Sequence, residues 1–194
     1  MGVSNGQQSD IYTRFPFESI PKRVFLDTSV INAIVKYPEE VFEQQSITPD
    51  IHPTLAGDIE ALRDIFFIGM RANWDIVASQ KTLDELACTT DDLLRVRLMS
   101  YALEIINRNI NEEDDRVAQD FARRLIDTHF VAALPGRADR ELIGNAIGYG
   151  CDVFCTRDRA TIVKKRARLQ HLGLKVMTPE EWWAHIRPWA ALWC

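Results

Sequence analysis

Hydrophobic residues along the chain gather into short apolar runs that alternate with segments of helical spacing. Four runs, at residues 23–27, 75–79, 152–156 and 174–177, are apolar without an alternation of polar and apolar positions. Strands that are covered by helices on both faces have this pattern, which is typical of parallel sheets. The pattern therefore predicts an α/β fold with a parallel central sheet of about four to five strands, sandwiched by helices in three layers.

The segments between these strands have the spacing of helices. Apolar residues recur there at intervals of three and four, and good capping residues stand at several of the starts. The expected helices are 29–37, 58–71, 80–88, 139–149, a basic helix after 158, and a last helix from Pro179. Thr178 and Glu181 mark the start of the last helix as a capping box.

The chain reads as one domain with additions. Residues 1–21 are polar and unpatterned, which predicts a flexible tail or a strap over the surface, and residues 22–194 form the domain. A helical insertion is expected around 91–127, with a break where asparagines cluster at 107–111. The prolines between residues 38 and 57 predict a long irregular connection.

Composition limits the class of protein. The 194 residues are 46% hydrophobic and 26% charged, as in soluble globular proteins, and no apolar run is long enough to span a membrane. The first residues do not have the order of a signal peptide, and four scattered cysteines indicate free thiols, so we expect a cytoplasmic protein. Cys151 and Cys155, four positions apart, should pack in the core on one face of a strand.

One segment departs from the acidic balance of the chain. Residues 157–168 hold six Arg or Lys residues and one Asp, which is a local charge of +5 in a chain of net charge −5. The net charge argues against broad attraction to nucleic acid, although a local patch can differ. A solvated helix face and a contact with a phosphate backbone are both consistent with this basic segment.

Four acidic residues have positions that suggest a common site. Asp27 ends the first strand, Asp158 follows the third strand by two residues, Glu85 lies one or two helical turns after the second, and Asp139 begins the helix before the third. Ligand sites of open parallel sheets form outside the carboxyl ends of the strands. We therefore expect these four carboxylates to meet at one rim of the sheet.

Carboxylates that meet in this way repel each other, so we expect a cation among them. Oxygen ligands without histidine or cysteine favour Mg²⁺ or Mn²⁺ over zinc. Such an ion lowers the pKa of a bound water, polarises a phosphoryl oxygen and shields a leaving alkoxide, as phosphodiester hydrolysis requires. The predicted metal ligands and catalytic residues are Asp27, Glu85, Asp139 and Asp158.

Polar residues beside these acids are candidates for substrate contacts. They are Thr28, Ser29, Thr156, Arg157 and Arg159. The hydroxyl groups could bind a carboxylate or a phosphate oxygen, and the arginines could meet phosphates or only neutralise nearby carboxylates. For His129, shortly before Asp139, we expect a packing role, with general acid catalysis as the alternative.

Three segments of the chain resemble the PIN-domain ribonucleases. They are VFLDTSVI at 24–31, QKTLDEL at 80–86 and ADRELIGNAIGYGCDVFCTRD at 138–158, within a likeness from about residue 23 to 183. The resemblance implies a parallel sheet between helices and three or four acids that bind magnesium or manganese to hydrolyse RNA. It makes Asp27, Glu85, Asp139 and Asp158 the first to fourth acids of the family.

The resemblance leaves the biological role open. Many small PIN domains are toxins of toxin–antitoxin pairs, but this chain is larger than such toxins usually are. RNA is the expected substrate, while a homodimer and an antitoxin-like protein partner remain alternatives. The tryptophans near the end could form such an interface or dock on the domain's own core. They are Trp182, Trp183, Trp189 and Trp193.

Two other functions fit parts of the same pattern. A catalytically silent PIN-like fold would be a nucleic-acid or protein-binding module, although four like charges at one rim are destabilising unless a metal is used. A phosphatase of the haloacid-dehalogenase type also has a nucleophilic Asp at the end of its first strand. That type requires a second Asp two positions later, where this chain has Ser29.

Overall fold

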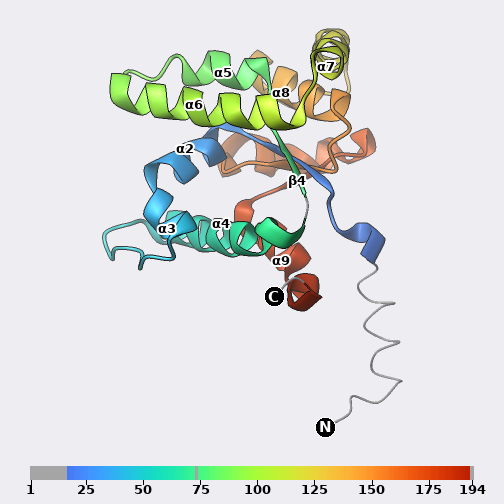
Figure 1. Cartoon of the computed structure of the whole chain (residues 1–194). Coiled ribbons are helices and arrows are strands. Elements are labelled where there is room, and N and C mark those ends of the chain that lie inside the picture. Colours follow the sequence, from blue (N-terminus) through green and yellow to red (C-terminus); the bar gives the residue numbers. More distant parts are fainter. Residues whose placement is uncertain (1–16, 73, 193–194) are drawn as a thin grey trace, which may run out of the picture.

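A sheet of four parallel strands forms the centre of the molecule (Figure 1). The computed structural model describes residues 17–72 and 74–192. The strands are β1 (Arg23–Leu26), β2 (Asp75–Val77), β3 (Val153–Cys155) and β4 (Lys175–Met177). β1 pairs with β2 and β3, and β3 pairs with β4, so the order is β2-β1-β3-β4. Helices cover both faces, and the predicted three-layer α/β fold is confirmed.

Two hydrophobic cores lie on the two faces of the sheet. Val24 and Leu26 of β1 face one core, whereas Phe25 faces the other, where it stacks on Phe154 with ring centroids 5.4 Å apart. The helices of the first core include α2 (Thr28–Lys36), α4 (Pro53–Ala72) and α9 (Pro179–Ile186), and those of the second include α7 (Glu112–Leu125) and α8 (Arg137–Gly148). In Figure 1, α4 and α9 accordingly lie across the sheet from α7 and α8.

The residues of the expected insertion form two helices that pack on the domain. α6 (Asp92–Asn109) contacts α2, β2 and α5 (Gln80–Leu86), while α7 packs along α8. Asn111 separates the two helices, because its side chain accepts a hydrogen bond of 2.8 Å from the N–H of Asp114 and so caps α7. The helix break predicted from the asparagine cluster is confirmed.

Small residues let α7 and α8 approach each other closely. A Cβ atom on Gly144 would lie 2.7 Å from the Cα atom of Ala122, and one on Gly148 would lie 2.5 Å from the Cα atom of Ala118. Larger side chains at these two glycines would push the helices apart. The contact therefore sets the position of α8, which carries Asp139.

The connection between α2 and α4 differs from the prediction. Residues 38–42 form a short helix, α3 (Pro38–Phe42), and α4 begins at Pro53, five residues earlier than expected. Proline is favourable at the first position of a helix, since the N–H that it lacks would have no helical partner there. Both prolines thus start helices, and residues 43–52 form the irregular part.

The basic segment after Asp158 is not the regular helix that was expected. It consists of a π-helical stretch, η2 (Arg159–Val163), and two 3₁₀ turns, η3 (Arg166–Arg168) and η4 (Gln170–Leu172). The β-branched run at 161–163 is unfavourable in an α-helix, and neighbouring cations repel. A three-residue repeat also lets Leu169 and Leu172 both pack against the second core.

Cys151 and Cys155 are both buried, as expected, but they do not share a face of the sheet. Cys151 packs in the second core and Cys155 in the first. The strand begins only at Val153, so Cys151 lies before it, next to a left-handed turn at Gly150 with φ of 68°. The alternation of a strand does not reach that far. Both thiols are free, as is that of Cys88.

The two ends of the described chain pack against the first core. η1 (Phe17–Ser19) precedes the buried Ile20, and the ring nitrogen Nε2 of His185 lies 2.8 Å from the carbonyl oxygen of Ser19. Trp182 and Trp189 are buried in the same core, and η5 (Arg187–Leu192) follows α9. Trp193 and residues 1–16 of the expected tail lie outside the described residues.

No helix within residues 17–72 and 74–192 is sufficiently long and apolar to cross a bilayer.

Candidate active site

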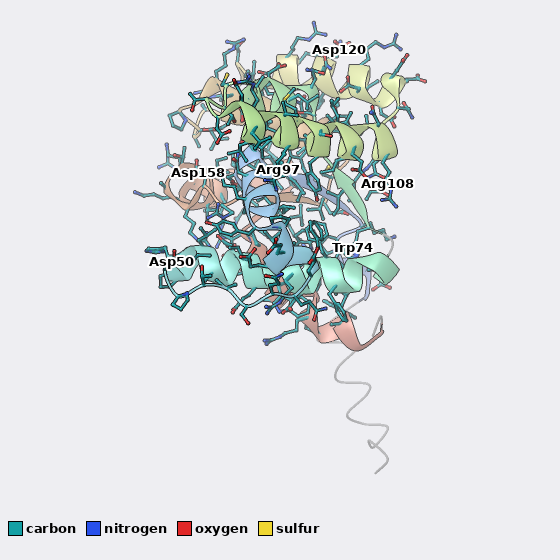
Figure 2. All side chains as sticks on the ribbon, turned by 60° about the vertical axis from the view of Figure 1, so that its left-hand side comes forward. Asp50, Trp74, Arg97, Arg108, Asp120 and Asp158 are labelled. Atoms are coloured by element: carbon teal, nitrogen blue, oxygen red, sulfur yellow. The ribbon has the colours of Figure 1, made fainter. Side chains whose placement is uncertain are left out.

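The strand order reverses at β1. The chain passes from β1 to β2 on one side and then to β3 on the other side. In open parallel sheets a ligand crevice forms at such a point, outside the carboxyl ends of the strands. Asp27 directly follows β1, and residues 156–158 directly follow β3, so both segments border this point. In Figure 2, Asp158 lies at the level of the sheet, between α4 and the helices of the opposite layer.

Asp27 is a buried carboxylate that three hydroxyl groups hold. Its Oδ2 accepts hydrogen bonds from Ser29 at 2.5 Å and from Thr156 at 2.7 Å, and its Oδ1 accepts a longer one of 3.3 Å from Thr28. The backbone of Asp27 caps α2, whereas its side chain does not. These hydroxyl groups could bind a carboxylate or a phosphate oxygen, and in the structure all three bind the carboxylate of Asp27. Oδ1 is the less occupied oxygen of Asp27.

Glu85 reaches the same threonine from α5. The Oγ1 atom of Thr28 lies 3.0 Å from Oε2 of Glu85, so its single proton is shared between Glu85 and Asp27. The adjacent Asp84 is exposed and instead accepts a hydrogen bond of 3.1 Å from Gln80. Partial burial raises the pKa of Glu85; the bond from Thr28 opposes this rise, and the charge of Asp27 adds to it.

Asp139 lies in the first turn of α8, close to the strand-end acids. Its side chain folds over Gly136, where an added Cβ atom would lie 2.6 Å from Oδ2. Partial burial raises the pKa of Asp139, the charges of Asp158 and Asp27 raise it further, and Lys165 opposes them. The charges of both strand-end acids thus act on Asp139 at the start of α8.

Asp158 is joined to Asp27 through one threonine. The Oδ1 atom of Asp158 accepts a hydrogen bond of 2.8 Å from the N–H of Thr161, which caps η2. The N–H of Asp158 donates to the hydroxyl oxygen of Thr156 at 3.0 Å, and that hydroxyl donates to Asp27. The first and fourth acids therefore occupy fixed positions relative to each other.

The four acids do not form a closed set of metal ligands. Within the part of the chain that the structure describes, no three side chains of Asp, Glu, His or Cys are grouped closely enough to hold a metal ion. Direct contact with one cation would therefore involve one or two of these carboxylates. This arrangement still suits Mg²⁺, which keeps several waters and takes one or two carboxylates directly. The oxygen-only donors at the rim fit such a hard ion.

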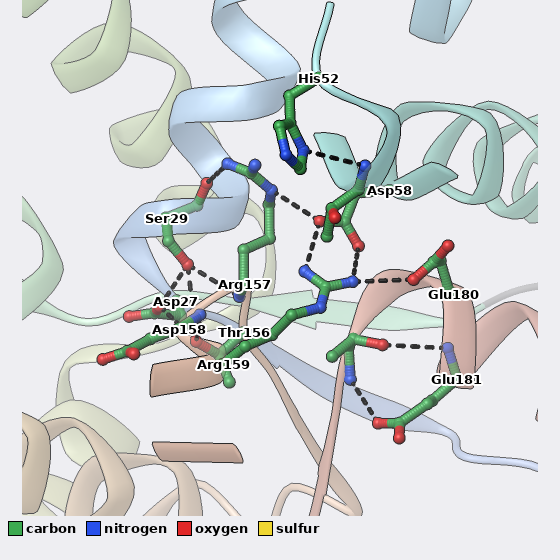
Figure 3. A network of polar contacts seen from close by, with 12 residues as sticks. Asp27, Ser29, His52, Asp58, Thr156, Arg157, Asp158, Arg159, Glu180 and Glu181 are labelled. Carbon is green, nitrogen blue, oxygen red and sulfur yellow. Dashed lines mark hydrogen bonds and ion pairs between the residues drawn. The ribbon is translucent and has the colours of Figure 1, made fainter. Parts of the chain in front are cut away.

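An aspartate outside the predicted set binds both candidate arginines (Figure 3). Asp58 of α4 is fully buried, and Arg159 donates to its two carboxylate oxygens at 2.7 and 2.8 Å. Arg157 donates to Oδ2 of Asp58 at 3.0 Å, and Arg159 also pairs with Glu180 at 2.8 Å. Both guanidinium groups thus have carboxylate partners within the chain, which leaves them less free for phosphates.

Arg157 extends this cluster to Asp27. Its backbone N–H donates to the hydroxyl oxygen of Ser29 at 2.9 Å, and its guanidinium group donates to the Ser29 carbonyl at 3.3 Å. The same hydroxyl group donates to Asp27. Figure 3 shows the resulting continuous series of polar contacts from Asp58 through Arg157 and Ser29 to Asp27.

Asp58 is not among the site residues predicted from the sequence, although the sequence contains a signal for it. Asp58 lies on the apolar face of its helix, three residues after Leu55 and four before Leu62. A charged residue on a buried face requires a partner of opposite charge. Asp58 also stands at the start of the predicted helix, where an acidic residue needs no other explanation.

A second buried contact joins the helices that carry Glu85 and Asp139. Ser79 caps α5 and forms a reciprocal capping box with Thr82. Asn145 of α8 donates a hydrogen bond of 3.1 Å to the hydroxyl oxygen of Ser79, and these three side chains are buried. The contact fixes the spacing between the two helices. Asn145 is not among the residues predicted from the sequence.

The six cations of the basic segment divide into two groups. Three form ion pairs within the chain: Arg157, Arg159 and Arg166. Three form no ion pair with any described residue: Lys164, Lys165 and Arg168. Only the second group is available for contacts with an anionic partner.

Comparisons with known proteins do not show a family for this chain. No family model matches it, and no curated protein or solved structure matches it significantly. The likeness of its motifs to PIN-domain ribonucleases therefore stays a prediction.

Proposed function

We propose that the chain is a metal-dependent ribonuclease of the PIN type, with its active site at the rim of the sheet. The main support is that Asp27 stands beside the reversal of the strand order and is linked through Thr28 to Glu85 and through Thr156 to Asp158. Asp27 and Glu85 share the proton of one hydroxyl group, that of Thr28. Burial and neighbouring negative charge raise the pKa of Glu85 and of Asp139, and a bound cation would relieve both effects.

The residues at the rim fit Mg²⁺ or Mn²⁺. Asp27, through its less occupied Oδ1, and Glu85 would hold the ion directly, and Asp139 and Asp158 would act through bound waters. When bound, the ion would supply an activated water and would shield the charge of the leaving alkoxide.

The hydroxyl groups around Asp27 would act as positioning groups. Ser29 and Thr156 both donate to Oδ2, which prevents rotation of the carboxylate. Ligand carboxylates in metal sites are commonly oriented by such hydrogen bonds. Thr28 would set the distance between Asp27 and Glu85, because it donates to an oxygen of each.

A catalytically silent PIN-like binding module is the second candidate. The absence of three closely grouped ligand side chains in the described residues favours it, as do the internal ion pairs of Arg157 and Arg159. Such a module would bind RNA or a protein partner without cleaving a bond. The two candidates differ in one measurable property, which is cleavage that depends on a divalent cation.

The test is a cleavage assay with labelled single-stranded RNA, duplex RNA and DNA in Mg²⁺ or Mn²⁺, with and without chelator. We expect RNA cleavage that the chelator abolishes. Asp27→Asn and Asp158→Asn should each lower the rate at least about a hundredfold, since a catalytic metal contributes several kcal/mol to the transition state.

Neighbouring acids on α5 provide a matched control. Glu85→Gln should abolish cleavage, whereas Asp84→Asn, one position earlier but exposed and turned away, should leave the rate unchanged. Equal activity of Asp27→Asn, Asp158→Asn and the wild type would rule out the metal site. RNA binding without any metal-dependent cleavage would instead support the silent module.

A further inference from the structure

Three ring side chains lie next to each other on the surface after α7. The ring centroids of His129 and Phe130 are 4.0 Å apart, and those of Phe130 and His171 are 5.4 Å apart. All three side chains are exposed, that of Phe130 to 42%. The ring of His129 thus packs on Phe130 at the surface, outside both cores.

A row of side chains connects these rings to the acidic rim. Lys165 directly precedes η3, Arg168 ends it, and His171 lies in the next turn, η4, so the three follow one another at intervals of three residues. At one end, Lys165 acts on the carboxyl group of Asp139. At the other end, the ring of His171 contacts Phe130. The exposed Arg168 lies between them.

The cations of this row are free to bind phosphate. Lys165 and Arg168 form no ion pair with the described residues, in contrast to Arg166, which pairs with Glu181. Proteins that bind single-stranded nucleic acids combine cations that follow the backbone with rings on which bases stack. A duplex does not offer its base faces in this way, because they are stacked inside the helix.

We propose that Lys165, Arg168, His171, Phe130 and His129 form a single-strand binding surface, on which an unpaired RNA base stacks against Phe130. The inference rests on the proposed ribonuclease function and adds to it a substrate-binding surface outside the acidic rim. A strand that follows the row would pass from the acidic rim to the rings, with its phosphates at Lys165 and Arg168.

The test is the affinity for a short fluorescent single-stranded RNA, measured by anisotropy in chelator so that no cleavage occurs. Phe130→Ala should weaken binding about tenfold, as expected for the loss of one stacked base. Phe130→Trp should retain the affinity, because stacking needs only a ring. Phe67→Ala is the matched control, since Phe67 lies on α4 and is 53% exposed. It should leave the affinity unchanged.

The salt dependence separates stacking from phosphate contact. Arg168→Gln should lower the slope of log affinity against log salt by about 0.7, the value for one phosphate contact with a single strand. Phe130→Ala should leave this slope unchanged, because a stacked base releases no counterion. Both residues are exposed, so neither substitution removes a core contact, and thermal unfolding of each variant checks that the fold is retained.

Equal affinity of Phe130→Ala and Phe67→Ala, with wild-type cleavage of RNA intact, would overturn the single-strand binding surface and leave the ribonuclease function standing. Equally tight binding of duplex RNA would overturn it as well. Absence of both binding and cleavage in the wild type would overturn both proposals, and the exposed rings would then be candidates for a protein contact.

Discussion

Arg159 donates one hydrogen bond to each carboxylate oxygen of Asp58, at 2.7 and 2.8 Å. Asp58 is fully buried, whereas 32% of the Arg159 side chain is exposed, so the pair lies between the core and the rim. With Arg157, the buried carboxylate accepts three charge-assisted hydrogen bonds, which offset the loss of its hydration. The pair thereby ties residues 157–159, and with them Asp158, to α4.

Replacement of Asp58 by asparagine should destabilise the protein. Asn has the same shape but no charge, so Arg157 would lose its carboxylate partner and Arg159 would keep only Glu180. We expect the free energy of unfolding to fall by about 3 kcal/mol, measured by urea denaturation. Glu60→Gln, an exposed change on the same helix, should alter it by less than about 0.5 kcal/mol. Similar stabilities of the two variants would contradict a structural role for the ion pair.

Repulsion among the rim carboxylates should lower the stability of the protein when no metal is bound. The pKa of Asp139 in the folded state is raised, so its ionised form at neutral pH favours the unfolded chain. Asp139→Asn should therefore raise the melting temperature in chelator, by no more than about 4 °C because solvent screens this half-exposed group. Mg²⁺ should stabilise the wild type more than the variant. Differential scanning fluorimetry measures both effects, with Asp84→Asn as the control.

The elements of the fold were predictable because local physics determines them. Residues 24–26 before Asp27 are all apolar. Thr28 and Ser29 after it are residue types that start helices, so the strand and the helix were both predictable. Asn111 caps α7 with its own side chain, which is also a local contact. Pro38 and Pro53 each start a helix at a position that was not predicted, since a proline can either end a helix or occupy its first position.

The details of the candidate site were not predictable, because they depend on contacts between distant segments. The positions of Asp27 and Asp158 follow from the ends of their strands. Whether Arg157 meets a phosphate or a carboxylate depends on Asp58, which is 99 residues away in the sequence. Likewise, Thr28 is a capping type in the sequence, and only the packing of α5 brings Glu85 within 3.0 Å of its hydroxyl group.

A pH-dependent contribution to stability is expected at Glu181. Although its partial burial acts in the opposite direction, hydrogen bonds from Arg166 and from the N–H of Thr178 hold the pKa of Glu181 below its ordinary value of 4.5. A lowered folded pKa stabilises the protein above about pH 4.5, and this stabilisation is lost as the pH falls through the folded value. Glu181→Gln should therefore flatten the fall in stability below pH 4.5, as followed by acid titration of circular dichroism. The exposed Glu113→Gln should not.

Two glycines in helices should respond to alanine with opposite signs. At Gly144 a Cβ atom would lie 2.7 Å from the backbone of Ala122, and the helices must separate to admit it, at a cost of about 1–3 kcal/mol. At Gly69 of α4 an added Cβ atom meets nothing within 4 Å, so alanine should stabilise the protein by about 1 kcal/mol through its higher helix propensity. Urea denaturation of both variants measures the difference.

Because α8 carries Asp139, Gly144→Ala should also lower metal-dependent RNA cleavage, whereas Gly69→Ala should not. Stabilisation by both substitutions would show that α7 and α8 do not pack as closely as the structure has them.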